Sequence, residues 1–185
     1  MASAAKVIGI SALVALGIWG ASKLAKTGMD AAAMVDTFDI DLGISNMRIS
    51  DGKIKMKLNV SIINPSEFAI TVKKPYVEVY LNEPGKSPYK IVSTSTSSEL
   101  LPIAACTQSP FEYDIEISLV SFVSTFSRLL SILIQDCNFN DLSFNGMLTI
   151  ASKISQNIDK LYPMLSVKVL TAWQGITINK EFPLA

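Results

Sequence analysis

The stretch KIKMKLNVSI, residues 53–62, decides the fold class, because its polar and apolar side chains alternate without interruption. Successive side chains of a β-strand point to opposite faces, so every second residue belongs to the same face. The apolar positions are Ile54, Met56, Leu58, Val60 and Ile62, and the polar ones begin with Lys53, Lys55 and Lys57. We therefore expect a half-buried strand with an apolar face on a core and a basic face in water.

The residues on either side of this strand define its ends. Residues 38–44 alternate in the same way, and Ser50-Asp51-Gly52 between the two runs is typical of a hairpin turn. Asn64-Pro65 ends the second run, because proline has no N–H to donate to a sheet. The sequence thus predicts an antiparallel hairpin.

Short alternating runs recur along the rest of the chain, separated by turn residues. Further strands are expected at residues 68–72, 77–81, 89–93, 111–117, 142–150, 164–171 and 176–182, with a bulge at Gly146. Residues 119–134 have helical spacing and predict one amphipathic helix, which we expect to close one end of the domain. About eight strands with one helix indicate an all-β chain that folds as a β-sandwich.

An uncharged run, Val7–Ser22, precedes the strands and has Lys6 before it and Lys23 and Lys26 after it. As a helix it would be about 24 Å long, short for a hydrocarbon core of about 30 Å, although flanking lysines can extend its reach. A signal peptide has a similar pattern, but we expect a retained single transmembrane helix. Its orientation stays open, because the flanking lysines are nearly balanced.

The candidate anchor and helix-packing residues are Val7, Ile10, Leu13, Leu16, Gly17, Trp19, Ala21 and Ala25. Small residues at every fourth position, as at Gly17, Ala21 and Ala25, let helices approach closely within a membrane. We therefore divide the chain into an anchor helix at 1–28, a connector at 29–36 and a sandwich domain at 37–185.

Composition excludes several function classes. The chain has 16 basic and 16 acidic residues, so it has no basic field for binding nucleic acid. Histidine, the usual general base and metal ligand, is absent. Cys106 and Cys137 fit no metal or redox motif, and we expect two free core thiols, with one disulfide as the alternative. We expect neither a cofactor nor a metal.

Three carboxylates, Glu112, Asp114 and Glu116, share one face of a predicted strand. Such groups can act in acid–base catalysis, but evenly spaced charges on a strand are usually solvated. We expect them to pair across the sheet with the lysines of residues 53–57, although those lysines could instead meet anionic lipid or an acidic partner. The chain is therefore predicted not to be an enzyme.

Two segments, KIKMKLNVSIINPSEFAITVKKPYVEVYLN and LSFNGMLTI, resemble the late-embryogenesis-abundant group 2 family, also called the water-stress and hypersensitive-response (WHy) domain. The family motif residues here are Asn64, Pro65, Gly146 and Leu148, and the resemblance covers residues 37–182. It implies an immunoglobulin-like sandwich without catalytic residues, often behind a membrane anchor. It also implies roles in stress protection, membrane association or binding of apolar ligands.

These observations favour a membrane-anchored structural or interaction protein, a component of a lipid-containing virion or a similar membrane-bounded assembly. Its expected partners are the lipid bilayer and other protein subunits, in an oligomer or lattice. The alternative is a bacterial envelope protein of the WHy type for stress protection or lipid binding. A pilin-like filament subunit is a third hypothesis, but Val7–Ser22 lacks the acidic residue that pilins bury near their start.

Overall fold

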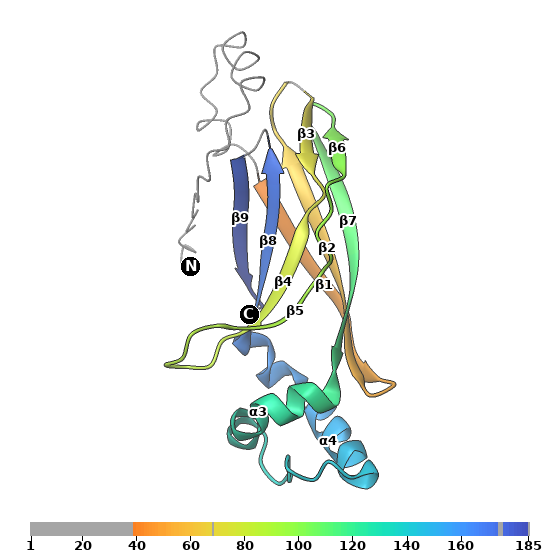
Figure 1. Cartoon of the computed structure of the whole chain (residues 1–185), viewed down its shortest axis with the longest axis vertical. Helices are drawn as coiled ribbons and strands as arrows, with labels where there is room; N and C mark the ends of the chain where they lie inside the picture. Colours follow the sequence, from red (N-terminus) through yellow and green to blue (C-terminus); the bar gives the residue numbers. More distant parts are fainter. Residues whose placement is uncertain (1–38, 68, 174–175, 185) are drawn as a thin grey trace.

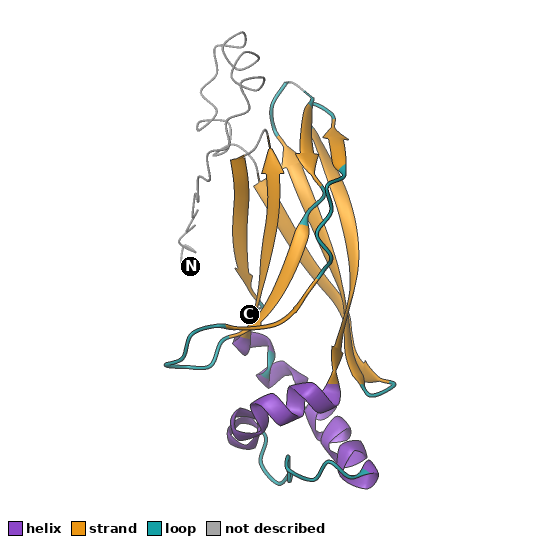
Figure 2. Ribbon diagram, in the orientation of Figure 1, coloured by secondary structure: helices purple, strands orange, loops and turns teal. Residues whose placement is uncertain are grey.

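The computed structural model describes residues 39–67, 69–173 and 176–184, which form a β-rich body with helices at one end (Figure 1, Figure 2). The strands are β1 (Asp39–Ser50), β2 (Lys53–Asn64), β3 (Ile70–Lys73), β4 (Tyr76–Leu81), β5 (Tyr89–Ser93), β6 (Leu100–Ile103), β7 (Thr107–Ser118), β8 (Leu165–Trp173) and β9 (Ile176–Pro183). The helices are α3 (Leu119–Leu133) and α4 (Phe144–Gln156), and the short 3₁₀ turns η1 (Ile158–Lys160) and η2 (Tyr162–Met164) follow them. The predicted anchor and connector lie outside the described residues.

The strands form two antiparallel sheets. The three-stranded sheet has the order β1-β2-β7. The six-stranded sheet has the order β5-β4-β8-β3-β6, and β9 pairs with β8. The two sheets curl around a shared interior as a half-barrel (Figure 1). The all-β prediction for the body is therefore confirmed.

The predicted hairpin is confirmed at β1 and β2, which pair antiparallel around a turn at Asp51 and Gly52. Both turn residues have positive φ, 54° and 67°, a conformation that aspartate tolerates and glycine adopts freely. The alternation of β2 also holds, because Leu58 and Val60 are fully buried while the lysines face outward. The strand register inferred from the sequence is therefore right.

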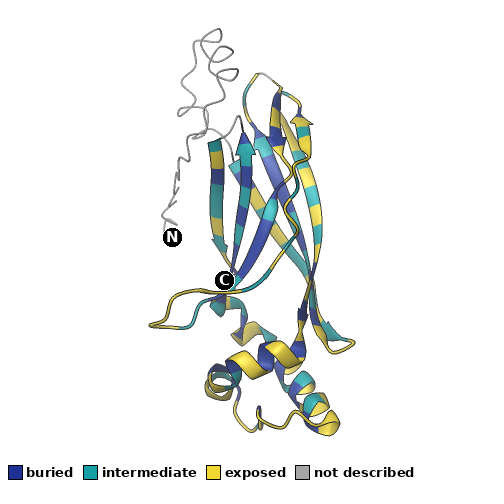
Figure 3. Ribbon diagram, in the orientation of Figure 1, coloured by how far each residue is buried: buried dark blue, intermediate teal, exposed yellow. Residues whose placement is uncertain are grey.

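One apolar cluster fills the space between the sheets and extends into the helices (Figure 3). Strand β4 supplies Val77, Val79 and Leu81, and β8 supplies Val167 and Val169, all at most 1% exposed. Two polar contacts join the sheets at their edges. The Tyr113 hydroxyl on β7 donates to the Pro75 carbonyl at 2.6 Å, and the Lys180 ammonium on β9 donates to Asp39 Oδ1 at 2.6 Å.

Helix α3 confirms the predicted helix at residues 119–134. Ser118 caps its start by accepting a hydrogen bond from the backbone N–H of Ser121 at 3.4 Å. Its buried residues follow a helical stripe, namely Leu119, Phe122, Val123, Phe126, Leu129 and Leu130. The helix packs this stripe against the open end of the sandwich, as expected.

The strand predicted at residues 142–150 is wrong, because residues 144–156 form the helix α4. Its buried stripe is Gly146, Ile150 and Ile154, spaced by four, whereas Phe144 and Leu148 are exposed. The even spacing of Leu142, Phe144, Leu148 and Ile150 suggested one apolar strand face. In the structure only Ile150 is buried, and the other three side chains are exposed. The domain therefore has two α-helices among its described residues, not the one predicted.

Gly146 has a different role from the predicted bulge. A Cβ atom at this position would lie 2.2 Å from the backbone oxygen of Asp141. Glycine therefore allows the first turn of α4 to approach the preceding loop. The Ser143 hydroxyl accepts a hydrogen bond from the Gly146 N–H at 3.2 Å and caps the helix.

Strand β6 was not predicted, because its sequence, LLPI, contains a proline. It lies at the edge of the six-stranded sheet and pairs with β3. An edge strand has one side without a neighbour, so Pro102 is tolerated there.

Candidate functional site

The outer face of the three-stranded sheet carries the most ordered set of charges in the described residues. We call the lysines Lys53, Lys55 and Lys57 of β2 and the carboxylates Glu112, Asp114 and Glu116 of β7 the charge ladder. In register, Lys55 faces Glu116 and Lys57 faces Asp114. The predicted cross-strand pairing is confirmed, because three ion pairs join these strands.

The ion pairs of the ladder run mostly along diagonals. Lys53 Nζ lies 2.5 Å from Glu116 Oε2, and Lys57 Nζ lies 3.1 Å from Glu112 Oε2. Lys55 Nζ lies 2.5 Å from Asp51 in the hairpin turn and 3.9 Å from Glu116 Oε1. The hydrogen bond from Lys53 holds the pKa of Glu116 below its usual value. Glu116 is therefore ionised at neutral pH, and all three carboxylates of the ladder are exposed to water, which is a poor environment for a general acid or base.

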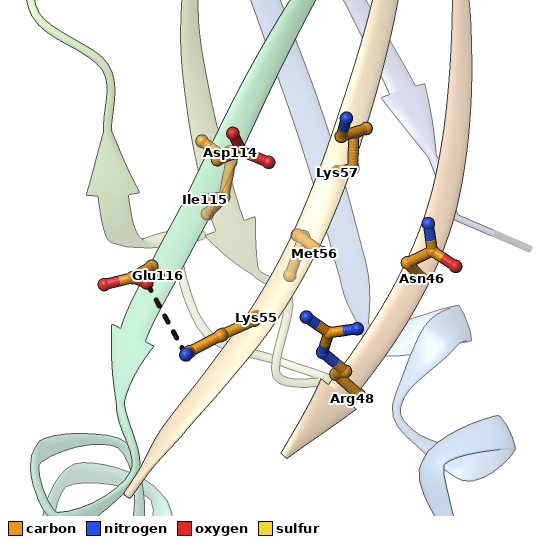
Figure 4. A pocket seen from close by; sticks show the side chains of 8 residues that line it. All are labelled: Asn46, Arg48, Lys55, Met56, Lys57, Asp114, Ile115 and Glu116. Carbon is orange, nitrogen blue, oxygen red and sulfur yellow. Dashed lines mark ion pairs between the residues drawn. The ribbon is translucent and has the colours of Figure 1, made fainter. Parts of the chain in front are cut away.

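A hollow of about 480 Å³ lies on this face where β1 departs from regular pairing (Figure 4). The register of β1 with β2 shifts between Ser45 and Arg48, so Asn46 and Met47 share one partner position. Asn46 adopts a positive φ of 56°. Because of this bulge, Met47 and Ile49 pack toward the core and Arg48 is exposed on the outer face.

The hollow contains two charged groups with no ion pair. Within residues 39–67, 69–173 and 176–184, Arg48 on β1 and Asp114 on β7 form no ion pair. Lys55 and Lys57, which also line the hollow, each form at least one. Neither Arg48 nor the bulge was predicted from the sequence. The signal was present, because the apolar spacing changes from two to three between Ile44 and Met47.

The six-stranded sheet holds a contrasting group, Glu78 on β4, which is 8% exposed. Its Oε1 accepts hydrogen bonds from the Tyr76 hydroxyl at 2.8 Å and from Lys90 Nζ at 3.0 Å. Its Oε2 accepts one from the Tyr80 hydroxyl at 2.6 Å. We call these four residues the Glu78 cluster. A Tyr-x-Glu-x-Tyr pattern, which puts all three side chains on one strand face, was the available sequence signal.

The carboxylate of Glu78 is ionised at neutral pH. Burial alone would raise the pKa of Glu78, but hydrogen bonds from Tyr80, Lys90 and Tyr76 outweigh it and leave that pKa below its usual value. The hydrogen bond to Glu78 raises the pKa of Tyr80 to about 12. Every acceptor of this carboxylate is occupied, so the cluster fastens edge strand β5 to β4 and has no oxygen left for a substrate.

The motif residues Asn64 and Pro65 form a structural corner at the end of β2. Asn64 is 1% exposed, and its side-chain amide donates to the Ala104 carbonyl at 2.9 Å. Its Oδ1 accepts from the Ser66 N–H at 3.1 Å and from the Ser66 hydroxyl at 2.7 Å. Asn64 therefore joins β2 to the loop between β6 and β7. The other motif residues lie on α4, where Gly146 is buried and Leu148 exposed.

Both cysteines are free, but the prediction of two core thiols is only half right. Cys137 is partly buried, and burial raises the pKa of its thiol. Cys106 is exposed in the turn between β6 and β7, with a positive φ of 52°. The need for a turn between two strands, not core packing, therefore sets the position of Cys106.

The helical end, which comprises α3, α4 and residues 134–143, exposes several large apolar side chains. Phe144 is 80% exposed, Ile132 66%, Leu148 56%, and Leu142 and Val120 47% each. Phe144 and Leu148 lie one turn apart on the same face of α4. The two helices contain no Asp or Glu, and their charged residues are Arg128 and Lys153. Residues 134–143 add the exposed Asp136 and Asp141, so this surface carries few charges, two of each sign, around its apolar side chains.

Other kinds of site are not found in the described part of the chain. It contains no group of three or more Cys, Asp or Glu residues placed to hold a metal ion. Its helices are too short or too polar to cross a membrane. The predicted anchor residues, from Val7 to Ala25, lie outside the described residues.

Comparison with known proteins gives fold-level likenesses at low similarity. No protein-family model and no curated protein matches the chain. The sporulation control protein Spo0M of Bacillus subtilis aligns with 80% of this chain, which spans 48% of that protein, at 10% identity and a TM-score of 0.41. A protein of Archaeoglobus fulgidus aligns with 80% of this chain and 96% of its own, at 8% identity and a TM-score of 0.38.

A putative late-embryogenesis-abundant protein is also similar to this chain. The alignment covers 88% of this chain and 80% of that protein, at 8% identity and a TM-score of 0.34. Scores of this size assign neither a family nor a function.

Proposed function

We propose that the chain is a non-enzymatic structural protein that its N-terminal segment anchors in a membrane and its helical end joins to protein subunits of a membrane-bounded assembly. The assembly that we propose is a lipid-containing virion. The immunoglobulin-like form of the sandwich and the membership of the WHy family belong to this proposal as well. The observation that carries it is the exposure of Phe144, Ile132 and Leu148 on a weakly charged surface.

The position of the helical end supports contact with protein partners over contact with the anchoring membrane. Strand β1 leads the chain from Asp39 to the hairpin over about 40 Å, given a rise of about 3.3 Å per residue. The hairpin adjoins the helical end, because the Gly52 carbonyl accepts a hydrogen bond from the Leu119 N–H at 2.9 Å. The apolar side chains therefore lie far from Asp39, where the N-terminal segment joins the body.

The charges of the body support a non-enzymatic role. The carboxylates best placed for chemistry, those of the charge ladder, are exposed and mostly paired with lysine. Glu78, the one deeply buried carboxylate among the residues that the structure describes, has both oxygens occupied by hydrogen bonds. Neither arrangement places a free carboxylate in an apolar pocket, the environment in which enzymes commonly keep an acid or a base.

The test compares a pair of exposed apolar residues at the helical end with one exposed apolar residue elsewhere, in the full chain purified in a nonionic detergent. The double variant Phe144→Ser, Leu148→Ser removes apolar area from the helical end. The control is Leu100→Ser, at a residue that is 61% exposed. Leu100 begins β6, a strand that lies at the end of the body opposite the helices (Figure 1). Light scattering after size-exclusion chromatography gives the mass of each complex.

We expect the parent and Leu100→Ser to form oligomers and the double variant to dissociate. A parent chain that is monomeric, or a double variant with the mass of the parent, would contradict contact between subunits through the helical end. Loss of liposome binding by the double variant, with no change in mass, would instead favour the lipid-binding alternative.

A further inference from the structure

Two like charges face each other across β1 and β2. Arg48 pairs in register with Lys55, directly after the bulge. Like charges directly opposite each other in a sheet are destabilising, so an anion beside Arg48 would stabilise this arrangement. Figure 4 shows the Arg48 side chain beside Lys55 on the neighbouring strand, both at the hollow.

The carboxylates of the chain compensate the lysines but not Arg48. Lys55 contacts Asp51 and Glu116, and Lys57 contacts Glu112. The acids of the hollow, Asp114 and Glu116, belong to β7, which is separated from β1 by the whole of β2. The β1 side of the hollow therefore has an uncompensated guanidinium.

The bulge presents polar groups that suit an oxyanion. It adds Asn46 to the outer face and keeps Arg48 exposed two residues later. A guanidinium binds two oxygens of a phosphate or carboxylate at once, and an amide can donate to a third. Lys55 and Lys57 add positive charge from β2.

We propose that this hollow binds a phosphate group, with the Arg48 guanidinium as its main donor and Asn46, Lys55 and Lys57 as flanking contacts. The unpaired guanidinium, with the remaining N–H donors of Lys55 and Lys57, offers more hydrogen bonds than the two oxygens of a carboxylate accept, so a phosphate group matches the hollow better. Asp114 lies on the far side of the hollow and repels the ligand, so the site is weak in the parent chain. This proposal does not depend on the proposed function.

The test is equilibrium dialysis of radiolabelled inorganic phosphate against the full chain in a nonionic detergent. We expect saturable binding that falls at least about tenfold in Arg48→Gln, because a bidentate, charge-assisted contact is lost. Asp114→Asn should bind phosphate more tightly than the parent. The matched control is Lys86→Gln, an exposed cation in the loop after β4, and it should bind like the parent.

Two results would overturn the proposal. One is the absence of saturable phosphate binding both in the parent chain and in Asp114→Asn. The other is an Arg48→Gln variant that binds as tightly as the parent. Circular dichroism of each variant shows whether the fold is kept, which we expect because Arg48, Asp114 and Lys86 are exposed.

A second arm identifies the source of the phosphate. The full chain is placed in phosphatidylcholine nanodiscs with or without phosphatidic acid, and binding of inorganic phosphate is measured again. If phosphatidic acid weakens the apparent binding of inorganic phosphate to the parent but not to Arg48→Gln, a lipid headgroup enters the hollow. Equal binding in both nanodiscs assigns the site to free phosphate.

Discussion

The outer faces of the two sheets differ in how far their charged side chains are buried. The three-stranded sheet spreads three lysines and three carboxylates over an open surface, where each ion pair is in contact with water. The six-stranded sheet buries a single carboxylate, Glu78, and surrounds it with two tyrosines and a lysine. Exposed ion pairs contribute little to stability, whereas removal of a buried, fully bonded charge leaves its donors without a partner. We therefore regard the charge ladder as a surface open to function and the Glu78 cluster as structure.

The strongest test of this comparison lies within one strand. Leu58→Asp places a charge in the core, where Leu58 is fully buried, and we expect a loss of more than about 4 kcal/mol in the free energy of unfolding. Lys57→Asp changes the neighbouring outward residue and should leave the domain folded. Urea unfolding followed by circular dichroism measures both. Equal losses for the two variants would mean that the inward face of β2 is misassigned.

The next test compares the two sheets directly through matched changes of glutamate. Glu78→Gln keeps the shape of the side chain but removes its charge, and we expect a loss of about 1–3 kcal/mol because three charge-assisted hydrogen bonds weaken. Glu116→Gln makes the same change on the exposed ladder and should have much less effect. The same urea titrations apply. If Glu116→Gln costs as much as Glu78→Gln, the ladder is structural and our division of roles fails.

The pH dependence of stability sharpens the same contrast. The pKa of Tyr80 rises to about 12 in the folded chain through its hydrogen bond to Glu78, so the fold favours the neutral hydroxyl. Its contribution is complete below the ordinary pKa of 10 and is lost as the pH rises from 10 to about 12. Burial raises the pKa of Tyr113 to about 12 as well, so it acts in the same range.

Urea unfolding between pH 9 and pH 12 checks this expectation. The parent should lose stability steadily over that range, and Tyr80→Phe should lose less, because it has no phenol to ionise at this position. Tyr113→Phe serves as the control for the second phenol. A Tyr80→Phe variant with the same pH profile as the parent would show that the Glu78 cluster does not bind the tyrosine as described.

Much of the body was predictable because its strands have one face in solvent and one in the core, which gives alternating polar and apolar residues. Alternation fixed β2 and its register, and Asp51-Gly52 fixed the hairpin. The same rule failed at α4, where Phe144 and Leu148 are apolar but exposed, so their spacing reflected a surface and not a core. Proline hid β6, since the rule against proline in strands does not hold at a sheet edge.

The sites were less predictable than the strands, because they depend on which strands become neighbours. The lysine–carboxylate pairing was expected from the charged faces of two alternating strands, and it forms because β2 and β7 are adjacent. The Glu78 cluster needs Lys90 from β5, and the hollow needs a bulge that changes the direction of Arg48. Local pattern does not determine that β5 lies beside β4, whereas the bulge had a local signal in the changed apolar spacing between Ile44 and Met47.

The smallest expected effect concerns salt. Ion pairs on an exposed surface are screened when the Debye length falls to about 3 Å, near 1 M salt, whereas a buried cluster is screened far less. We expect the parent to lose slightly more stability between 0.05 and 1 M sodium chloride than the double variant Lys57→Gln, Glu112→Gln, in which one ladder pair is neutral. Glu78→Gln should respond to salt as the parent does, because the ladder is intact in it. Urea unfolding at both salt concentrations measures the differences. A larger change in salt response for Glu78→Gln than for the ladder variant would reverse the comparison, since it would mean that the Glu78 cluster is the more exposed to solvent of the two.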